Sequence, residues 1–315
     1  MTTDKIYVPP IKIQGIKTKL VPFIKDNVSL SEKTIWIEPF MGSGVVGFNI
    51  APATAVFADT NPHIIEFYNQ IKTGKITAYI VRQFLEEEGR ILSQKDDRYY
   101  YEVRDRFNET HNSLDFLFLN RSCFNGMIRF NRNLAFNVPY GHKPQRFSKA
   151  YITKIVNQIA HVEELLKNND WTFLCQSFEQ TIQAADPGSF IYCDPPYIGR
   201  HVDYYDSWNE QSELSLCQEL LASKARFMLS TWDHNAYRQN EYIEKVWHFC
   251  HKNTQKHFYH VGAKETNRNP MTEALLTNYA TAENKNLLLS GYRQLSLFDS
   301  VDTTIVKSKD ILSYK

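Results

Sequence analysis

The sequence has no long apolar run and little cysteine, and both shortages narrow the classes of protein it can belong to. No stretch of its 315 residues approaches the length needed to cross a membrane, and the amino-terminal MTTDKIYVPP has no hydrophobic signal-peptide core. The five cysteines are odd in number, scattered and never spaced as CxxC, which indicates neither a disulfide framework nor a thiolate zinc site. We therefore expect a cytoplasmic protein with no membrane contact and no bound metal.

Acidic residues are missing from residues 116–162, although the formal net charge of the whole chain is only +1. The cationic residues of this segment are Arg121, Arg129, Arg132, Lys143, Arg146, Lys149 and Lys154, and it also carries Asn120, Asn125, Asn131, Asn133 and Asn137 among its asparagines. Arginine, lysine and asparagine suit phosphates and base edges, so the segment predicts contact with nucleic acid. A solvated basic face is the alternative that explains the charge alone.

Short apolar segments indicate buried parallel strands that alternate with helices. Strands are expected at residues 34–37, 55–58, 171–175, 190–193, 226–230, 257–261 and 274–277. Asn61 followed by Pro62 is typical of a helix start, with an end near Gly74, and a second helix is expected around residues 213–222. This alternation predicts an α/β fold with its sites at the carboxyl ends of the strands.

The alternation is interrupted between residues 75 and 150, where polar helical patterns lead into the basic segment. We interpret residues 75–150 as an inserted, mostly helical region and residues 1–74 with 151–288 as one discontinuous domain. After residue 288 the chain is rich in Ser, Asp, Lys and Thr, which predicts a flexible tail over residues 289–315.

The heptapeptide EPFMGSG, from Glu38 to Gly44, joins a predicted strand to a predicted helix. Its glycines let the backbone approach a ligand closely. No Lys-Ser/Thr follows Gly44, so a nucleoside triphosphate loop is excluded. The next strand ends at Asp59, where an acid can accept hydrogen bonds from ribose hydroxyls. The loop and the acid together favour a cofactor that carries a nucleoside.

The tetrapeptide DPPY, Asp194, Pro195, Pro196 and Tyr197, ends another predicted strand. Prolines fix φ and supply no N–H, so the Asp194 carboxylate and the Pro195 carbonyl form a rigid pair of acceptors suited to an NH2 group. Tyr197 adds a flat surface for a planar ring. An amino group on a nucleic-acid base fits these features, and a base inside a duplex has to be flipped out to reach them. A strand-ending turn with a satisfied acid is the alternative.

Taken in order, these motifs resemble those of the Dam-type (D12 class, alpha-group) DNA adenine methyltransferases. PPIKIQGIK (residues 9–17), EPFMGSG, ADTN (58–61), FLNRSCFNGMIRFNRNLAFNVPYG (118–141), CQSF (175–178) and DPPY match the family's segments. The resemblance implies a Rossmann-like methyltransferase sheet with an inserted target-recognition domain. It also implies transfer of a methyl group from S-adenosylmethionine to the exocyclic amine of a flipped adenine in duplex DNA.

The resemblance also assigns roles to particular positions. Cofactor-binding positions are Lys12, Ile13, Gly15, Lys17, Glu38, Pro39, Phe40, Gly42, Ser43, Gly44, Asp59, Ser177, Phe178 and Asp194, and the catalytic set is Asp194 to Tyr197. Ile13 stands where many members have an aromatic residue, and Ser177 stands where an acid is usual. From the basic insertion we expect DNA contacts at Arg121, Asn125, Arg129, Arg132 and Lys143.

Two other features invite functional hypotheses. His248, Cys250, His251, His257 and His260 could suggest a metal site, but histidines that face DNA or are partly buried fit this segment better. In the tail, QLSLF from Gln294 to Phe298 resembles the pentapeptide that docks on the bacterial replication sliding clamp. Packing of that peptide on the catalytic domain explains it equally well.

Three functions stay open at this point. Adenine methylation is preferred, methylation of the N4 amine of cytosine shares the chemistry of the Asp194 site, and a DNA-binding relative without activity is the non-catalytic alternative. The sequence contains nothing like a nuclease domain, so a cognate restriction endonuclease would be a separate chain.

Overall fold

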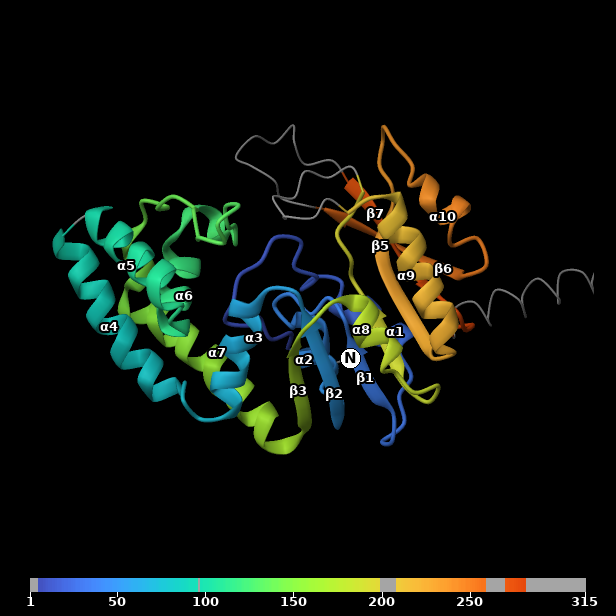
Figure 1. Ribbon diagram of the computed structural model, residues 1–315, viewed down its shortest axis with the longest axis horizontal. Coiled ribbons are helices and arrows are strands. Elements are labelled where there is room, and N and C mark those ends of the chain that lie inside the picture. Colours follow the sequence, from blue (N-terminus) through green and yellow to red (C-terminus); the bar gives the residue numbers. More distant parts are fainter. Residues whose placement is uncertain (1–4, 96, 199–207, 259–269, 282–315) are drawn as a thin grey trace, which may run out of the picture.

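A mixed seven-stranded sheet forms the centre of the computed structural model, which describes residues 5–95, 97–198, 208–258 and 270–281 (Figure 1). The strands are β1 (Ile35–Glu38), β2 (Thr54–Asp59), β3 (Asp170–Cys175), β4 (Phe190–Cys193), β5 (Arg226–His234), β6 (His251–Phe258) and β7 (Pro270–Thr277). Their order across the sheet is β3-β2-β1-β4-β5-β7-β6. The expected α/β fold is confirmed.

The order of the strands across the sheet reverses between β1 and β4, which are parallel neighbours. From β1 the chain moves outward through β2 to β3, and it then returns to β4 on the other side of β1. Beyond β4, β5 pairs with β4 in parallel, and β7 lies between β5 and β6 and is antiparallel to both. In open α/β sheets the crevice at such a reversal, outside the carboxyl ends of the strands, is where ligands bind.

The central strands are apolar because both faces of the sheet are covered. Trp36 and Ile37 are adjacent in β1 but belong to two different clusters of buried side chains, one on each face. Phe190 and Ile191 in β4 divide in the same way, and the register pairs Trp36 with Phe190 and Ile37 with Ile191. Burial on both faces explains the short continuous apolar runs in the sequence.

The helices close to the sheet are α1 (Val21–Asn27), α2 (Val45–Ile50), α3 (Pro62–Lys72), α8 (Phe178–Gln183), α9 (Glu210–Ser223) and α10 (Glu241–Lys245). The start of α3 confirms the sequence prediction, because the Asn61 side chain accepts hydrogen bonds from the backbone N–H groups of His63 and Ile64. Helix α9 is longer than the predicted 213–222. It begins at Glu210, with Asn209 as its N-cap.

A group of long helices lies to one side of the sheet (Figure 1). It consists of α4 (Ala78–Lys95), α5 (Asp97–Thr110), α6 (Ser113–Ser122) and α7 (Lys149–Asn168), with the short 3-10 helices η1 (Phe124–Gly126) and η2 (Pro144–Phe147) between α6 and α7. Helix α7 packs against α4 and η2. It also contacts α3 and β3, so α7 joins the group of long helices to the sheet, and the division of the chain at residue 150 stays a prediction.

Further expectations concern β6, the carboxyl-terminal residues, metal binding and membrane contact. Strand β6 begins at His251 rather than at residue 257, because the whole of His251–Phe258 pairs with β7. His260, the QLSLF peptide and the expected tail over residues 289–315 lie outside the described residues. Across the described ranges, no set of three or more His, Cys, Asp or Glu side chains is placed to hold a metal ion. No described helix combines the length and apolarity needed to cross a membrane.

Candidate active site

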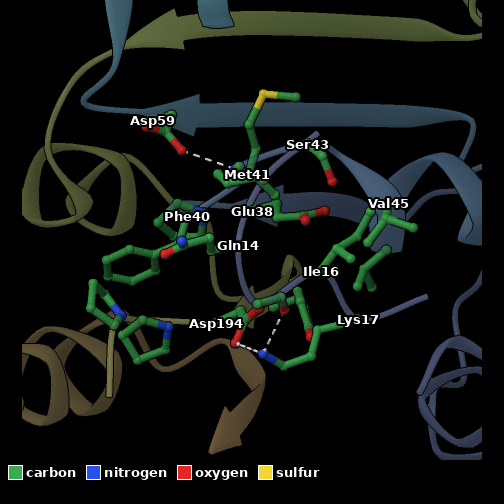
Figure 2. Close-up of a pocket in the computed structure, with 18 of the residues that line it drawn as sticks. Gln14, Ile16, Lys17, Glu38, Phe40, Met41, Ser43, Val45, Asp59 and Asp194 are labelled. Atoms are coloured by element: carbon green, nitrogen blue, oxygen red, sulfur yellow. Dashed lines mark hydrogen bonds and ion pairs between the residues drawn. The ribbon is translucent and has the colours of Figure 1, made fainter. Parts of the chain in front are cut away.

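A cavity of about 290 Å³ lies at the reversal point of the sheet (Figure 2). It is lined by the amino-terminal segment, the loop after β1, the end of β2, the start of α8 and the end of β4. Of the residues expected at the site, the lining includes Ile13, Gly15, Lys17, Glu38, Pro39, Phe40, Gly42, Ser43, Asp59, Phe178, Asp194, Pro195, Pro196 and Tyr197. Motifs that are far apart in the chain therefore meet in one pocket.

The loop after β1 is held by its glycines and by Asp59. Gly42 and Gly44 have φ of 50° and 78°, a region that favours glycine. The Asp59 Oδ2 atom accepts a hydrogen bond from the Gly42 N–H at 2.9 Å, while Oδ1 accepts one from the Asn61 N–H at 2.9 Å. Each carboxylate oxygen has a further lone pair, so Asp59 can still accept hydrogen bonds from a ligand.

Glu38 ends β1 as a buried carboxyl group that ties the loop to α2. Its Oε2 atom accepts hydrogen bonds from Trp36 Nε1 at 3.0 Å and from the Gly47 N–H at 3.1 Å. Burial, together with the nearby charge of Asp194, raises the pKa of Glu38 to about 8, although the two hydrogen bonds oppose this shift.

The raised pKa of Glu38 predicts a pH-dependent contribution to stability. The folded state binds this proton more tightly than the unfolded state, whose pKa is near 4.5. The stabilisation is therefore complete below about pH 4.5 and is lost as the pH rises through about 8. For Glu38→Gln, whose amide oxygen keeps an acceptor, thermal melts across this range should show a shallower decline in stability than wild type. Parallel curves for the two proteins would contradict the assignment.

The DPPY segment places Asp194 opposite Lys17. The Lys17 ammonium lies 2.8 Å from Asp194 Oδ1 and donates a hydrogen bond to the Gly15 carbonyl at 3.2 Å (Figure 2). Lys17 Nζ also lies 4.9 Å from the centre of the Tyr197 ring, and the Tyr197 hydroxyl donates to Glu273 Oε2 in β7 at 2.8 Å. Burial raises the pKa of Asp194, and the Lys17 ammonium counteracts part of that shift.

One wall of the site is aromatic. Phe40 and Phe178 stack with ring centres 5.4 Å apart, and Trp208 meets Phe40 edge to face at 5.5 Å. The Trp208 indole N–H donates to Glu213 Oε2 at 2.6 Å. Because Trp208 and Glu213 belong to no site motif, the sequence reasoning missed this support.

Three expected cofactor residues are absent from the cavity lining. Ser177 caps α8: its hydroxyl accepts from the Gln180 N–H, and the Gln180 side chain accepts from the Ser177 N–H. Gly44 is the N-cap residue of α2, where a Cβ would lie 2.6 Å from the Phe48 ring. Lys12 turns toward Tyr151, with its ammonium 5.6 Å from the ring centre. The lining residues that the sequence reasoning did not name are Gln14, Ile16, Met41, Val45, Val46, Thr60 and Tyr192.

The expected DNA contacts differ in how accessible they are. Asn125, Arg132 and Lys143 are exposed, whereas Arg129 is half-buried and donates through Nε to Asn137 Oδ1 at 2.8 Å. The Arg121 side chain is only 2% exposed. This burial argues against a direct Arg121–DNA contact, because every residue of α6 except Leu114 is buried.

Comparison with known proteins places these observations in a family. Residues 14–281 match the model of the D12 class N6 adenine-specific DNA methyltransferase. The chain is 29% identical to type II methyltransferase M1.LlaDCHI of Lactococcus lactis subsp. cremoris, over 88% of this chain and 97% of that protein. It is 34% identical to a DNA adenine methylase of Haemophilus influenzae, over 59% of this chain and 68% of that protein. It is 30% identical to a DNA adenine methylase of Serratia marcescens, over 71% of this chain and 83% of that protein. The chain therefore belongs to the D12 class of N6 adenine-specific DNA methyltransferases.

Proposed function

We propose that this enzyme takes its methyl group from S-adenosylmethionine bound in the cavity, and that Asp194 and the Pro195 carbonyl hold the amine of a flipped adenine. The observation that supports this most strongly is that two motifs meet where the strand order reverses, between β1 and β4. There the glycine loop after β1 and the DPPY segment after β4 line the same cavity.

The chemistry of the cavity suits this donor. Two aspartates, Asp59 and Asp194, line it beside one ammonium group, that of Lys17, and Glu38 adds a carboxyl group that its raised pKa keeps mostly protonated at neutral pH. This balance favours a ligand with cationic groups, such as a sulfonium and an ammonium. Asp59 has lone pairs for ribose hydroxyls, and Phe178 presents an aromatic surface to a purine ring. When bound, S-adenosylmethionine supplies an electrophilic methyl group on its sulfonium.

The adenine amine is a poor nucleophile because its lone pair is conjugated with the ring. Hydrogen bonds from its two N–H groups to Asp194 and to the Pro195 carbonyl favour a pyramidal nitrogen, which frees the lone pair for in-line attack. Lys17 fixes the Asp194 carboxylate, and Glu273 anchors the Tyr197 ring that adjoins it. The surplus proton leaves the nitrogen after transfer, so Asp194 need not be a strong base.

DNA recognition we assign to the helical region, with Asn125, Arg132 and Lys143 as its accessible contacts. Methylation at a specific site is supported by relatives named as type II methyltransferases. A base inside a duplex is out of reach of the cavity, so the target has to be flipped. A separate cognate restriction endonuclease fits this proposal, and docking of QLSLF on a sliding clamp remains a hypothesis about residues beyond the described ranges.

Methylation mapping tests the proposal. The pure protein is incubated with S-adenosylmethionine and unmethylated bacterial genomic DNA, and modified bases are located by single-molecule sequencing. N6-methyladenine in one short motif is the expected result, and it also supplies the recognition sequence. Methylated cytosine would favour the N4 alternative. No modification by a preparation that binds the cofactor would favour a DNA-binding relative without activity.

Ser177→Ala separates capping from cofactor binding. Loss of the cap of α8 should lower the free energy of unfolding by about 1 kcal/mol, because one backbone N–H loses its acceptor. The KM for S-adenosylmethionine should stay as in wild type, since the Ser177 hydroxyl does not line the cavity. Phe178→Ala, which removes a lining side chain, is the matched variant and should raise that KM.

A further inference from the structure

Three cationic side chains gather around Tyr151, at the junction of the amino-terminal segment, α6, η2 and α7. Lys12 Nζ lies 5.6 Å and the Arg121 guanidinium 5.7 Å from the centre of the Tyr151 ring. Arg121 also donates to the Tyr151 hydroxyl at 3.5 Å, and Arg146 donates to the backbone carbonyls of Arg121 and Cys123 at 3.2 Å each. We call Lys12, Arg121, Arg146 and Tyr151 the Tyr151 cluster.

The Tyr151 cluster has no anionic partner within the part of the chain that the structure describes. None of its three cations lies within ion-pair distance of a described carboxylate. Arg121 is 2% exposed, and its buried Nε has no hydrogen-bond partner among the described residues. Burial lowers the pKa of both Lys12 and Arg121, and the charge of Arg146 lowers each further, while Tyr151 opposes both shifts. Such a site gains from binding an anion.

The cluster is open to solvent on one side, since Lys12, Arg146 and Tyr151 are all half-buried. It is also close to the cavity along the chain, because Lys12 directly precedes the lining residue Ile13. The Asn120 side chain accepts from the Lys12 N–H and donates to the Lys12 carbonyl, which fixes this segment on α6. An anion bound here would therefore have a defined position relative to the cavity.

A purely structural explanation is that Tyr151 itself balances the cations. Burial acts to raise the pKa of Tyr151, but the hydrogen bond with Lys12 and the charge of Arg121 outweigh it, so the pKa is lowered. One hydroxyl group still faces three cations, and the carbonyls at the end of α6 supply only partial charges. The positive charge of the cluster is therefore not fully balanced, and an anion with a full negative charge would be stabilised there.

We propose that the Tyr151 cluster binds one phosphodiester group of the DNA backbone, with Lys12, Arg146 and the Tyr151 hydroxyl in contact and Arg121 acting as a buried charge beneath them. The inference rests on the proposed action on DNA and adds a phosphate site that fixes the duplex relative to the cavity. Phosphate is the anion that DNA offers, and cationic and hydroxyl donors are its usual partners.

The test measures DNA binding as a function of salt concentration, on a duplex that carries the mapped recognition sequence. Each phosphate contact contributes about 0.9 to the slope of log K against log[salt]. Lys12→Gln and Arg146→Gln should each make the slope shallower. Because both side chains hold the same phosphate, the double variant should lose about 0.9 in total rather than about twice that. Lys33→Gln, which replaces an exposed cation in the turn before β1, at the opposite end of the strand from the cavity, is the control.

A second measurement changes the DNA rather than the protein. Phosphates are replaced one at a time by neutral methylphosphonates. At one position the replacement should lower the affinity of wild type for the duplex, whereas it should not change the affinity of the double variant. A wild-type slope in the double variant, or an equal loss in Lys33→Gln, would overturn the phosphate site. Failure of wild type to methylate a duplex that it binds would instead contradict the proposed function, since the phosphate site is judged by binding alone.

Discussion

Asp194→Asn is expected to lower kcat by at least about 10²-fold, and Asp194→Ala by about 10³-fold, with little change in DNA binding. The carboxylate is one of the two acceptors proposed to hold the adenine amine. An asparagine keeps the shape and one acceptor oxygen toward Lys17, so the fold should survive, but the negative charge is lost. Single-turnover methylation with saturating DNA and S-adenosylmethionine gives the rate directly.

The matched control is Asp186→Ala, because Asp186 is an exposed carboxylate in the loop before β4 and lies outside the cavity lining. Its rate should equal that of wild type. Removing the carboxylate leaves Lys17, which is 5% exposed, without its ion-pair partner. Melting curves for the Asp194 variants therefore have to show that they are still folded. Near-normal turnover in well-folded Asp194→Ala would remove this residue from the mechanism.

Gly47→Ala is expected to destabilise the protein by about 3 kcal/mol. In an ordinary helix this change is stabilising by up to about 1 kcal/mol, so the sign of the effect is diagnostic. In α2, a Cβ at Gly47 would lie 2.2 Å from the Phe57 ring and 2.5 Å from Glu38 Oε2. Both neighbours are buried and have little room to move. The substitution would also disturb the hydrogen bond from the Gly47 N–H to Glu38, beside the cavity.

Urea denaturation of wild type and Gly47→Ala measures this loss. Gly188→Ala is the control, because nothing lies within 4 Å of a Cβ at Gly188, which is exposed. Its free energy of unfolding should change by no more than about 0.5 kcal/mol. A Gly47→Ala variant as stable as wild type would show that α2 can move away from Phe57 and that Glu38 is not held tightly.

The sequence by itself determined which functional residues lie at the carboxyl ends of the strands. Strands β1, β2 and β4 are short and buried, and each ends in a residue type with a local physical role: Glu38 and a glycine turn, Asp59, and Asp194 with its prolines. Such signals need only a few consecutive residues, so a single sequence displays them. The rule that ligands bind at the carboxyl ends of parallel strands then places the three ends together.

Contacts between distant residues were decided only by the tertiary structure. Tyr197 is anchored by Glu273, 76 residues away, and Lys12 is held by Asn120, 108 residues away. Arg121 was predicted as a surface contact from its charge alone, yet the apolar residues around it in α6 were already a signal for burial. Local sequence fixes what a side chain can do, whereas packing fixes which side chains meet. The cations around Tyr151 come together because four separate segments pack at one junction.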